Sequence, residues 1–164
     1  MFGLGRRERA AEAIRRGTLA ALTGGYFHHS QVEAFELNSE ASAWLYTEGL
    51  AHQVYALGLI YTNTVLGNHT WATPQFFFES VRAAMSEHEV SNSLPLGSIS
   101  SFVFPRLETF QNFDRLQLVA GKQFELSAGD TMVRDPKADV PRITQALKVA
   151  TDSYFDGAKR MFGL

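Results

Sequence analysis

The 164-residue sequence contains no cysteine. It therefore cannot form disulfides, and it has neither a thiolate nucleophile nor cysteine ligands for zinc. The formal net charge is only −2, which is too small to favour nucleic acid as a partner. No run approaches the roughly 20 apolar residues of a membrane-spanning helix. We expect neither nucleic acid nor a membrane among the partners.

The short motifs of common enzymes are also missing. A G-x-x-x-x-G-K phosphate loop is excluded, because Leu116 stands where Gly121 and Lys122 would require a first glycine. The motifs G-x-G-x-x-G, G-x-S-x-G and H-E-x-x-H are absent, and no glutamate is followed three residues later by histidine, as in di-iron bundles. We expect no cofactor and no bound metal.

The composition is that of an ordinary globular protein, with 45% hydrophobic and 20% charged residues. At roughly 150 residues per domain, residues 1–164 are expected to form one domain. Arg15 and Arg16 interrupt the apolar segment that a secretory signal would need, and Glu8 and Glu12 are unusual in a mitochondrial presequence. We expect a soluble, cytoplasmic protein.

Three segments combine helical spacing of apolar residues with residue types that start or stop helices. These segments are 6–23, which stops at Gly24; 74–90, with Thr73 as cap and Pro74 in the first position; and 141–161, where Asp139 precedes Pro141.

A further helix is predicted at 41–66. From Ala41 to Phe78, the only Asp, Glu, Lys or Arg is Glu48. A helix that is apolar nearly all round belongs in a core or an interface, so this one is expected to be central. Before it, either Ser39 caps a helix that starts at residue 40, or one helix runs through from residue 30.

The segment after residue 100 allows alternatives. Residues 105–119 are expected to be helical, but 116–126, with Gly121 in the middle, can also form a hairpin. Residues 127–136 are expected to be a loop, because Gly129, Asp130 and Pro136 are typical of turns. Together these elements predict an all-α, single-domain bundle of five to six helices around a charge-poor central helix.

Glu48, His52 and Tyr55 are the first candidate for chemistry. Their spacing of four and three residues places them on one face of the central helix. A carboxylate that orients a histidine is typical of general base catalysis and of metal second shells. The structural alternative is a satisfied polar cluster that fixes the helix register.

A second candidate is His29 with Glu33, Glu36 and Glu40, whose spacing of four, three and four places all of them on one helical stripe. Carboxylates and histidine can bind a metal, but no closed ligand motif is present. We therefore favour a partner-binding surface over a metal site.

Two further features concern histidine and phenylalanine. His88, between two glutamates, is expected to be a core histidine with a satisfied polar tip. The three phenylalanines at 76–78 point in three directions on a helix, so at least one is expected to contact a further element or a partner.

Charge is distributed unevenly along the chain. Residues 1–22 hold five Arg against two Glu, whereas residues 23–100 hold seven Glu against one Arg. The simple interpretation is that the basic first helix packs near the acidic segment. The other interpretation is an acidic patch that a basic partner recognises.

The favoured function is a non-enzymatic protein-interaction module of the inhibitor, immunity or adaptor type, which binds a protein partner through an acidic, aromatic-bearing helical surface. The apolar excess also suggests a homodimer. The alternative is a helical small-molecule-binding protein or enzyme with a pocket lined by Glu48, His52 and Tyr55. The first interpretation predicts that Glu48 and His52 are closed off from solvent.

Overall fold

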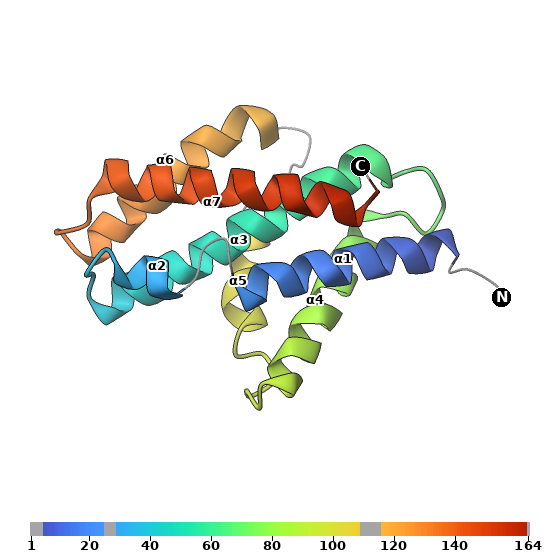
Figure 1. Ribbon diagram of the computed structural model, residues 1–164, viewed down its shortest axis with the longest axis horizontal. Coiled ribbons are helices and arrows are strands. Elements are labelled where there is room, and N and C mark those ends of the chain that lie inside the picture. Colours follow the sequence, from blue (N-terminus) through green and yellow to red (C-terminus); the bar gives the residue numbers. More distant parts are fainter. Residues whose placement is uncertain (1–4, 25–28, 109–115, 164) are drawn as a thin grey trace.

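The computed structural model describes residues 5–24, 29–108 and 116–163. Within these ranges the chain is helical and has no strand, so the all-α class is confirmed. Seven helices are present, more than the five to six predicted. They are α1 (Arg6–Thr23), α2 (His29–Glu33), α3 (Ser39–Thr64), α4 (Pro74–Ser91), α5 (Ser100–Glu108), α6 (Leu116–Arg134) and α7 (Val140–Met161) (Figure 1).

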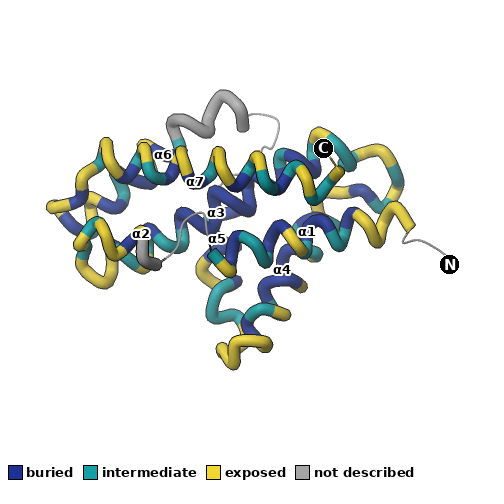
Figure 2. The backbone as a smooth tube through the Cα atoms, in the orientation of Figure 1, coloured by how far each residue is buried: buried dark blue, intermediate teal, exposed yellow. Residues whose placement is uncertain are grey.

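The charge-poor helix α3 is the central element of the fold. Residues 48–58 are buried on every face of this helix, as the dark blue segment in the middle of Figure 2 shows. Every other helix of the described ranges contacts α3. None of these helices is long and apolar enough to cross a membrane.

The apolar core has two parts along α3. One part joins the C-terminal half of α3 to α1, α4, α5 and the end of α7, and the other joins its N-terminal half to α2, α6 and the start of α7. Gly17 permits the close contact between α1 and α3, because a Cβ atom there would lie 2.5 Å from Cδ1 of Leu57. Tyr154 of α7 donates a hydrogen bond to the Gly17 carbonyl at 2.7 Å, which ties α7 to the same crossing.

The predicted ends of three helices are confirmed. The hydroxyl of Thr73 accepts a hydrogen bond from the Phe76 amide at 3.1 Å at the start of α4. Asp139 accepts from the Arg142 amide at 3.2 Å at the start of α7. Helix α1 ends at Gly24, whose φ of 79° is readily adopted by glycine.

The start of α3 differs from both predicted alternatives. The chain does not run through as one helix, because α2 ends at Glu33 and Glu36 has a positive φ of 53°. The cap is Asn38 rather than Ser39, and its side chain accepts from the Ala41 amide at 2.8 Å. The amide of Asn38 donates in turn to Asp135 at 2.8 Å, which joins this turn to the connection between α6 and α7.

Helix α6 decides between the two alternatives for residues 116–126 and corrects one prediction. Residues 116–126 are helical and not a hairpin, and the loop predicted at 127–136 was wrong, since α6 continues to Arg134. Ala128 and Thr131 are fully buried, and the Thr131 hydroxyl donates to the Ser127 carbonyl at 2.8 Å. Burial of this face outweighs the low helix propensity of Gly129. Residues 109–115 of the helix predicted at 105–119 lie outside the described ranges.

The buried polar group at the end of α4 is Glu89 and not the predicted His88. His88 is half-buried, and its ring nitrogen lies 3.3 Å from the side-chain nitrogen of Asn92. Glu89 is fully buried, and its carboxylate accepts from the Ile99 amide at 2.8 Å and from the Ser98 hydroxyl at 3.3 Å. The carboxylate therefore stabilises the start of α5, where helical N–H groups are unsatisfied.

The three phenylalanines of α4 all contact elements within the protein. Phe77 is buried and stacks on Tyr61 with a centroid distance of 5.4 Å. Phe76 meets the edge of Trp71 at 5.1 Å, and Phe78 meets Phe77 at 5.5 Å. Phe76 and Phe77 therefore contact elements outside α4, as predicted for at least one ring of this run.

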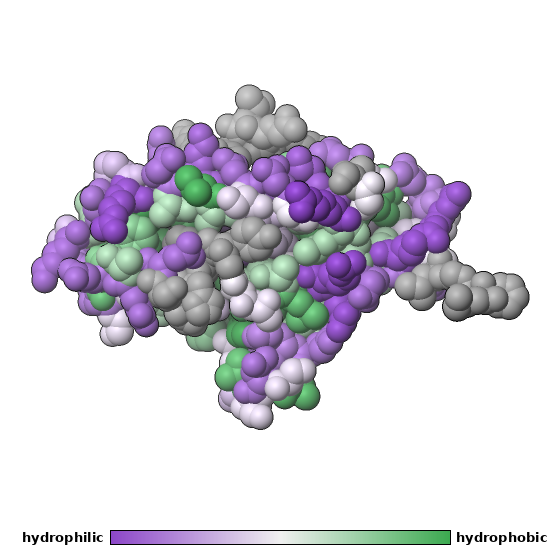
Figure 3. All heavy atoms as spheres, viewed as in Figure 1, coloured by the Kyte–Doolittle hydropathy of each residue, from purple (hydrophilic) through white to green (hydrophobic). Residues whose placement is uncertain are grey.

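The basic helix α1 packs against α4, as the simple interpretation of the charge pattern predicts. Arg15 donates from Nε and Nη2 to the two carboxylate oxygens of Glu87, at 2.8 and 2.6 Å. Helices α4 and α5 project from the rest of the molecule (Figure 1). Hydrophobic side chains reach the surface at this tip, shown in green in Figure 3, where Leu96 and Phe102 are 72% and 66% exposed.

Candidate functional site

The buried charge of the central helix is neutralised inside the fold. Glu48 has no exposed surface, and its carboxylate receives two parallel hydrogen bonds from Arg106 of α5. Nε donates to Oε2 at 2.8 Å and Nη2 donates to Oε1 at 2.7 Å. A bidentate pair of this kind is among the strongest charge-assisted contacts in proteins. It holds α5 against α3.

Ser127 of α6 links this carboxylate to His52. The Ser127 hydroxyl lies 3.2 Å from Oε1 of Glu48 and 2.9 Å from Nε2 of His52. A carboxylate only accepts, so the single hydroxyl hydrogen of Ser127 points to Glu48. The serine oxygen must then accept from His52, which places the imidazole hydrogen on Nε2.

His52 is held neutral by its surroundings. Burial, together with the nearby charge of Arg106, lowers the pKa of His52 to about 3. The ring also packs against Phe124, with centroids 4.8 Å apart. An imidazole with this pKa is a weak base at neutral pH, and its Nε2 hydrogen prevents it from accepting the Ser127 proton.

Tyr55, the third residue of the predicted catalytic group, is 7% exposed, and burial raises the pKa of its phenol. All three residues lie on α3, the predicted central helix, and all three are buried. The two cavities described below are lined by other residues. A catalytic role for Glu48, His52 and Tyr55 stays a prediction.

A large groove lies beside this network, between α2, α3, α5 and the end of α6. Its volume is about 780 Å³, within the size range of ligand and partner pockets. The floor is apolar and consists of the buried side chains of Val32, Leu50 and Val103. The exposed ring of Phe102 forms part of the wall. We call this feature the α3–α5 groove.

Trp44 lies in the α3–α5 groove under two arginines. The guanidinium carbon of Arg134 is 3.7 Å from the centre of the indole ring, and that of Arg106 is 4.9 Å away. Arginine over an aromatic ring is stabilised by the electrostatic attraction between cation and ring face. Because Arg106 also pairs with Glu48, one side chain connects the buried network to the groove.

The predicted acidic stripe is divided by the break between α2 and α3. Glu33 and Glu40 both line the α3–α5 groove, and Glu40 lies 4.0 Å from Arg134. Glu36 stands in the turn between the helices and does not line the groove. The side chain of His29 lies outside the described part of the structure. The premise that all four share one helical face was wrong, whereas their role in partner binding stays a prediction.

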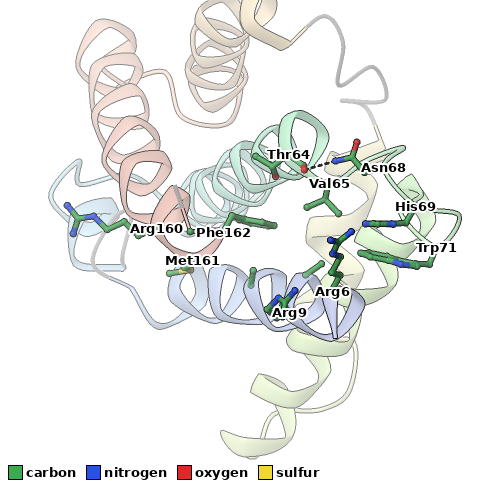
Figure 4. A pocket seen from close by; sticks show the side chains of 13 residues that line it. Arg6, Arg9, Thr64, Val65, Asn68, His69, Trp71, Arg160, Met161 and Phe162 are labelled. Carbon is green, nitrogen blue, oxygen red and sulfur yellow. Dashed lines mark hydrogen bonds between the residues drawn. The ribbon is translucent and has the colours of Figure 1, made fainter. Parts of the chain in front are cut away.

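A second cavity of about 450 Å³ lies where α1 begins and where α3 and α7 end. Arg6, Arg9 and Arg160 line it, together with His69 and Trp71 from the α3–α4 connection (Figure 4). The rings of His69 and Trp71 stack with centroids 5.3 Å apart and an angle of 12° between their planes. We call this feature the basic pocket.

Sequence reasoning missed the partners of Glu48. Ser127 was assigned to a loop, and Arg106 received no role. One signal was available for Arg106: it stands within an apolar segment, where a charged residue needs an opposite charge if it is buried. Nothing in the sequence pattern pairs Ser127 with His52, because they are 75 residues apart and belong to different helices.

Comparisons of this chain with protein-family models, curated proteins and solved structures find no match.

Proposed function

We propose that this protein is a non-enzymatic protein-interaction module whose α3–α5 groove binds an amphipathic helical segment of a partner that carries basic residues beside its apolar face. The observation that carries the proposal is the combination of an apolar groove floor, the exposed ring of Phe102 and two glutamates in the groove lining. Helical peptides commonly bind apolar grooves in this way.

The charges of the groove support a basic partner. Glu33 is exposed, and the side chain of Glu40 is 78% exposed. The two arginines of the groove are less available, because Arg106 is paired with buried Glu48 and Arg134 lies over Trp44 with 28% of its side chain exposed. The accessible charge is therefore mainly acidic, and acidic surfaces accelerate association with basic partners.

The closed network supports binding over catalysis. Glu48 and His52 are 0% and 2% exposed, and the Glu48 carboxylate is held by Arg106 and Ser127. This agrees with the solvent-excluded state that the interaction hypothesis predicts. A small-molecule site or active centre around Glu48, His52 and Tyr55 would need an opening that no cavity described above provides.

The proposal is tested by capture from lysate of the source cells with tagged protein and three variants. Ala43→Arg places a long side chain in the groove from an exposed helical position, and the double variant Glu33→Lys with Glu40→Lys reverses its acidic charge. Glu79→Lys on α4 is the control, because it reverses the charge of one glutamate at an exposed site outside the groove.

We expect a partner that wild type and Glu79→Lys capture equally and that both groove variants lose. Cross-linking should place a basic amphipathic segment of that partner at the groove, and the synthetic segment should bind wild type at least tenfold more tightly than the charge-reversed variant. Equal capture by all four proteins, or no captured partner, would contradict the proposal. Self-association that the groove variants abolish would assign the groove to a second copy of this chain instead.

A further inference from the structure

The basic pocket is separate from the α3–α5 groove and has a different chemistry. Its volume of about 450 Å³ falls within the range of roughly 300–1,000 Å³ that is typical of small-molecule sites. Figure 4 shows Arg6 extending from α1 beside His69 and Trp71, and Arg9 also belongs to the lining. Arg160 stands at the edge, and its side chain extends outward in this view.

The positive charge of this pocket is not balanced within its lining. Among the described residues that line it, none is an aspartate or a glutamate. The guanidinium groups of Arg6 and Arg160 make no hydrogen bond or ion pair within the described ranges. By contrast, Arg15 and Arg106 are each bound by a carboxylate. Arg6 therefore offers charged donors to a ligand in the pocket.

The N-terminus of α1 also favours a ligand with negative charge. Arg6 and Arg9 are three residues apart in the first turn of α1, so they lie on one side of that helix. The partial positive charge of the α1 N-terminus points to the same end of the molecule. The lining also contains apolar side chains, among them Ala13 of α1, Val65 after α3 and Phe162 after α7. The ligand that fits both parts has an anionic group and an uncharged organic portion.

The ends of α3 and α7 offer another use for the arginines, because cations are attracted to helical C-termini. The contacts do not favour this use. Neither Arg6 nor Arg160 donates to a carbonyl at either helix end in the described ranges. The carbonyl of Thr64 at the end of α3 is already bound by the side chain of Asn68 at 2.9 Å, drawn as a dashed line in Figure 4.

We propose that the basic pocket binds a small organic phosphate, with the phosphate at Arg6 and the uncharged portion against Val65 and Phe162. A phosphate carries about two negative charges at neutral pH, and the planar arginine fork matches its oxygens. The site stands independently of the groove, so it is a second binding function of the same chain.

The tryptophans provide a direct measurement. The chain has two, and Trp71 lines the basic pocket while Trp44 lines the groove. Trp44→Phe therefore leaves Trp71 as the single fluorescent tryptophan. In this background, inorganic phosphate, AMP and glucose 6-phosphate are titrated, with adenosine and glucose as the unphosphorylated counterparts. Isothermal titration calorimetry on the protein with both tryptophans checks each result.

The variants are Arg6→Gln and the double change Arg6→Gln with Arg9→Gln. Arg16→Gln is the matched control, since it removes the same charge from an exposed position of α1 outside the pocket. Circular dichroism verifies that each variant is folded. We expect saturable binding of at least one organic phosphate, at least tenfold weaker in Arg6→Gln and unchanged in Arg16→Gln.

Three results would overturn the proposal: no saturable binding of any of the phosphates, equal binding of the unphosphorylated counterparts, or binding that Arg6→Gln leaves unchanged. A lower Tm of Arg6→Gln without phosphate binding by wild type would show that the arginines only stabilise the helix ends. Ala43→Arg in the groove should leave phosphate binding intact, which separates failure of this proposal from failure of the groove proposal.

Discussion

Buried His52 makes the stability of this protein depend on pH in a predictable direction. The folded state keeps His52 neutral, with a pKa of about 3, whereas the unfolded chain protonates it with the ordinary histidine pKa of about 6.5. Below pH 6.5 the unfolded state therefore binds a proton that the folded state excludes. The contribution of His52 to the free energy of unfolding is therefore fully present above pH 6.5 and is lost as the pH is lowered toward 3.

The size of the effect follows from the difference between these two pKa values. Each pH unit below 6.5 costs about 1.4 kcal/mol, so acidification from pH 7 to about pH 4.5 should lower the free energy of unfolding by about 2.5 kcal/mol through His52 alone. Asp135 acts at lower pH, because hydrogen bonds from the amides of Asn38 and Lys137 hold its pKa below the usual value. The contributions of His52 and Asp135 to the free energy of unfolding are separable, because they change in different pH ranges.

The assay is urea denaturation followed by circular dichroism at several pH values between 7 and 4.5. His52→Gln removes the titrating group and keeps a polar atom that can reach Ser127, so its stability should depend much less on pH in this window. His88→Gln, at the half-buried position on α4, is the control and should follow wild type. The reasoning would be refuted by a wild-type stability that is flat down to pH 4.5, or by an unchanged slope in His52→Gln.

Two further predictions concern packing and charge, both measured by urea denaturation at neutral pH. Arg106→Met should lower the free energy of unfolding by about 3–5 kcal/mol, since it leaves the buried carboxylate of Glu48 unpaired. The double variant Arg106→Met with Glu48→Leu should be less destabilised than Arg106→Met alone, because no unpaired charge is left in the core. Gly17→Ala should destabilise the folded protein by about 1–2 kcal/mol, because the new Cβ would clash with Leu57. Gly129→Ala should stabilise it by about 0.5–1 kcal/mol, because the new Cβ meets no atom within 4 Å in a helix that alanine favours. Equal effects of the two alanines would contradict the packing explanation.

The elements that the sequence predicts correctly are those whose signals are local. Thr73, Asp139 and Gly24 act on amides or backbone angles within a few residues of themselves, so the residue type alone indicates a helix end. The central helix is predicted for a similar reason, because a long segment with one charge can only be stable in a core.

The errors occur where tertiary contacts outweigh local preference. Residues 127–134 contain Gly129 and Asp130 but remain helical, because Ala128 and Thr131 are buried against the rest of the fold. The break before α3 depends on Asp135, which binds the Asn38 amide from 97 residues away. No pattern within residues 29–40 could indicate that contact.

The candidate site shows the same division. The helical spacing correctly places Glu48, His52 and Tyr55 together on one buried helix. Whether His52 or Ser127 donates the hydrogen bond between them depends on Glu48, on Arg106 and on the packing of three helices. The chemical state of the site is therefore a property of the assembled fold, and it could not be read from α3 alone.

The contacts of Glu48 also have a consequence for the order of folding. Arg106 and Ser127 follow Glu48 by 58 and 79 residues, so both leave the ribosome well after the central helix. Until α5 and α6 dock, α3 is an apolar helix with an unpaired carboxylate, and its closure over Leu50 and Leu57 would bury that charge at high cost. The charge of Glu48 therefore disfavours burial of the central helix until α5 and α6, which emerge later, supply its partners.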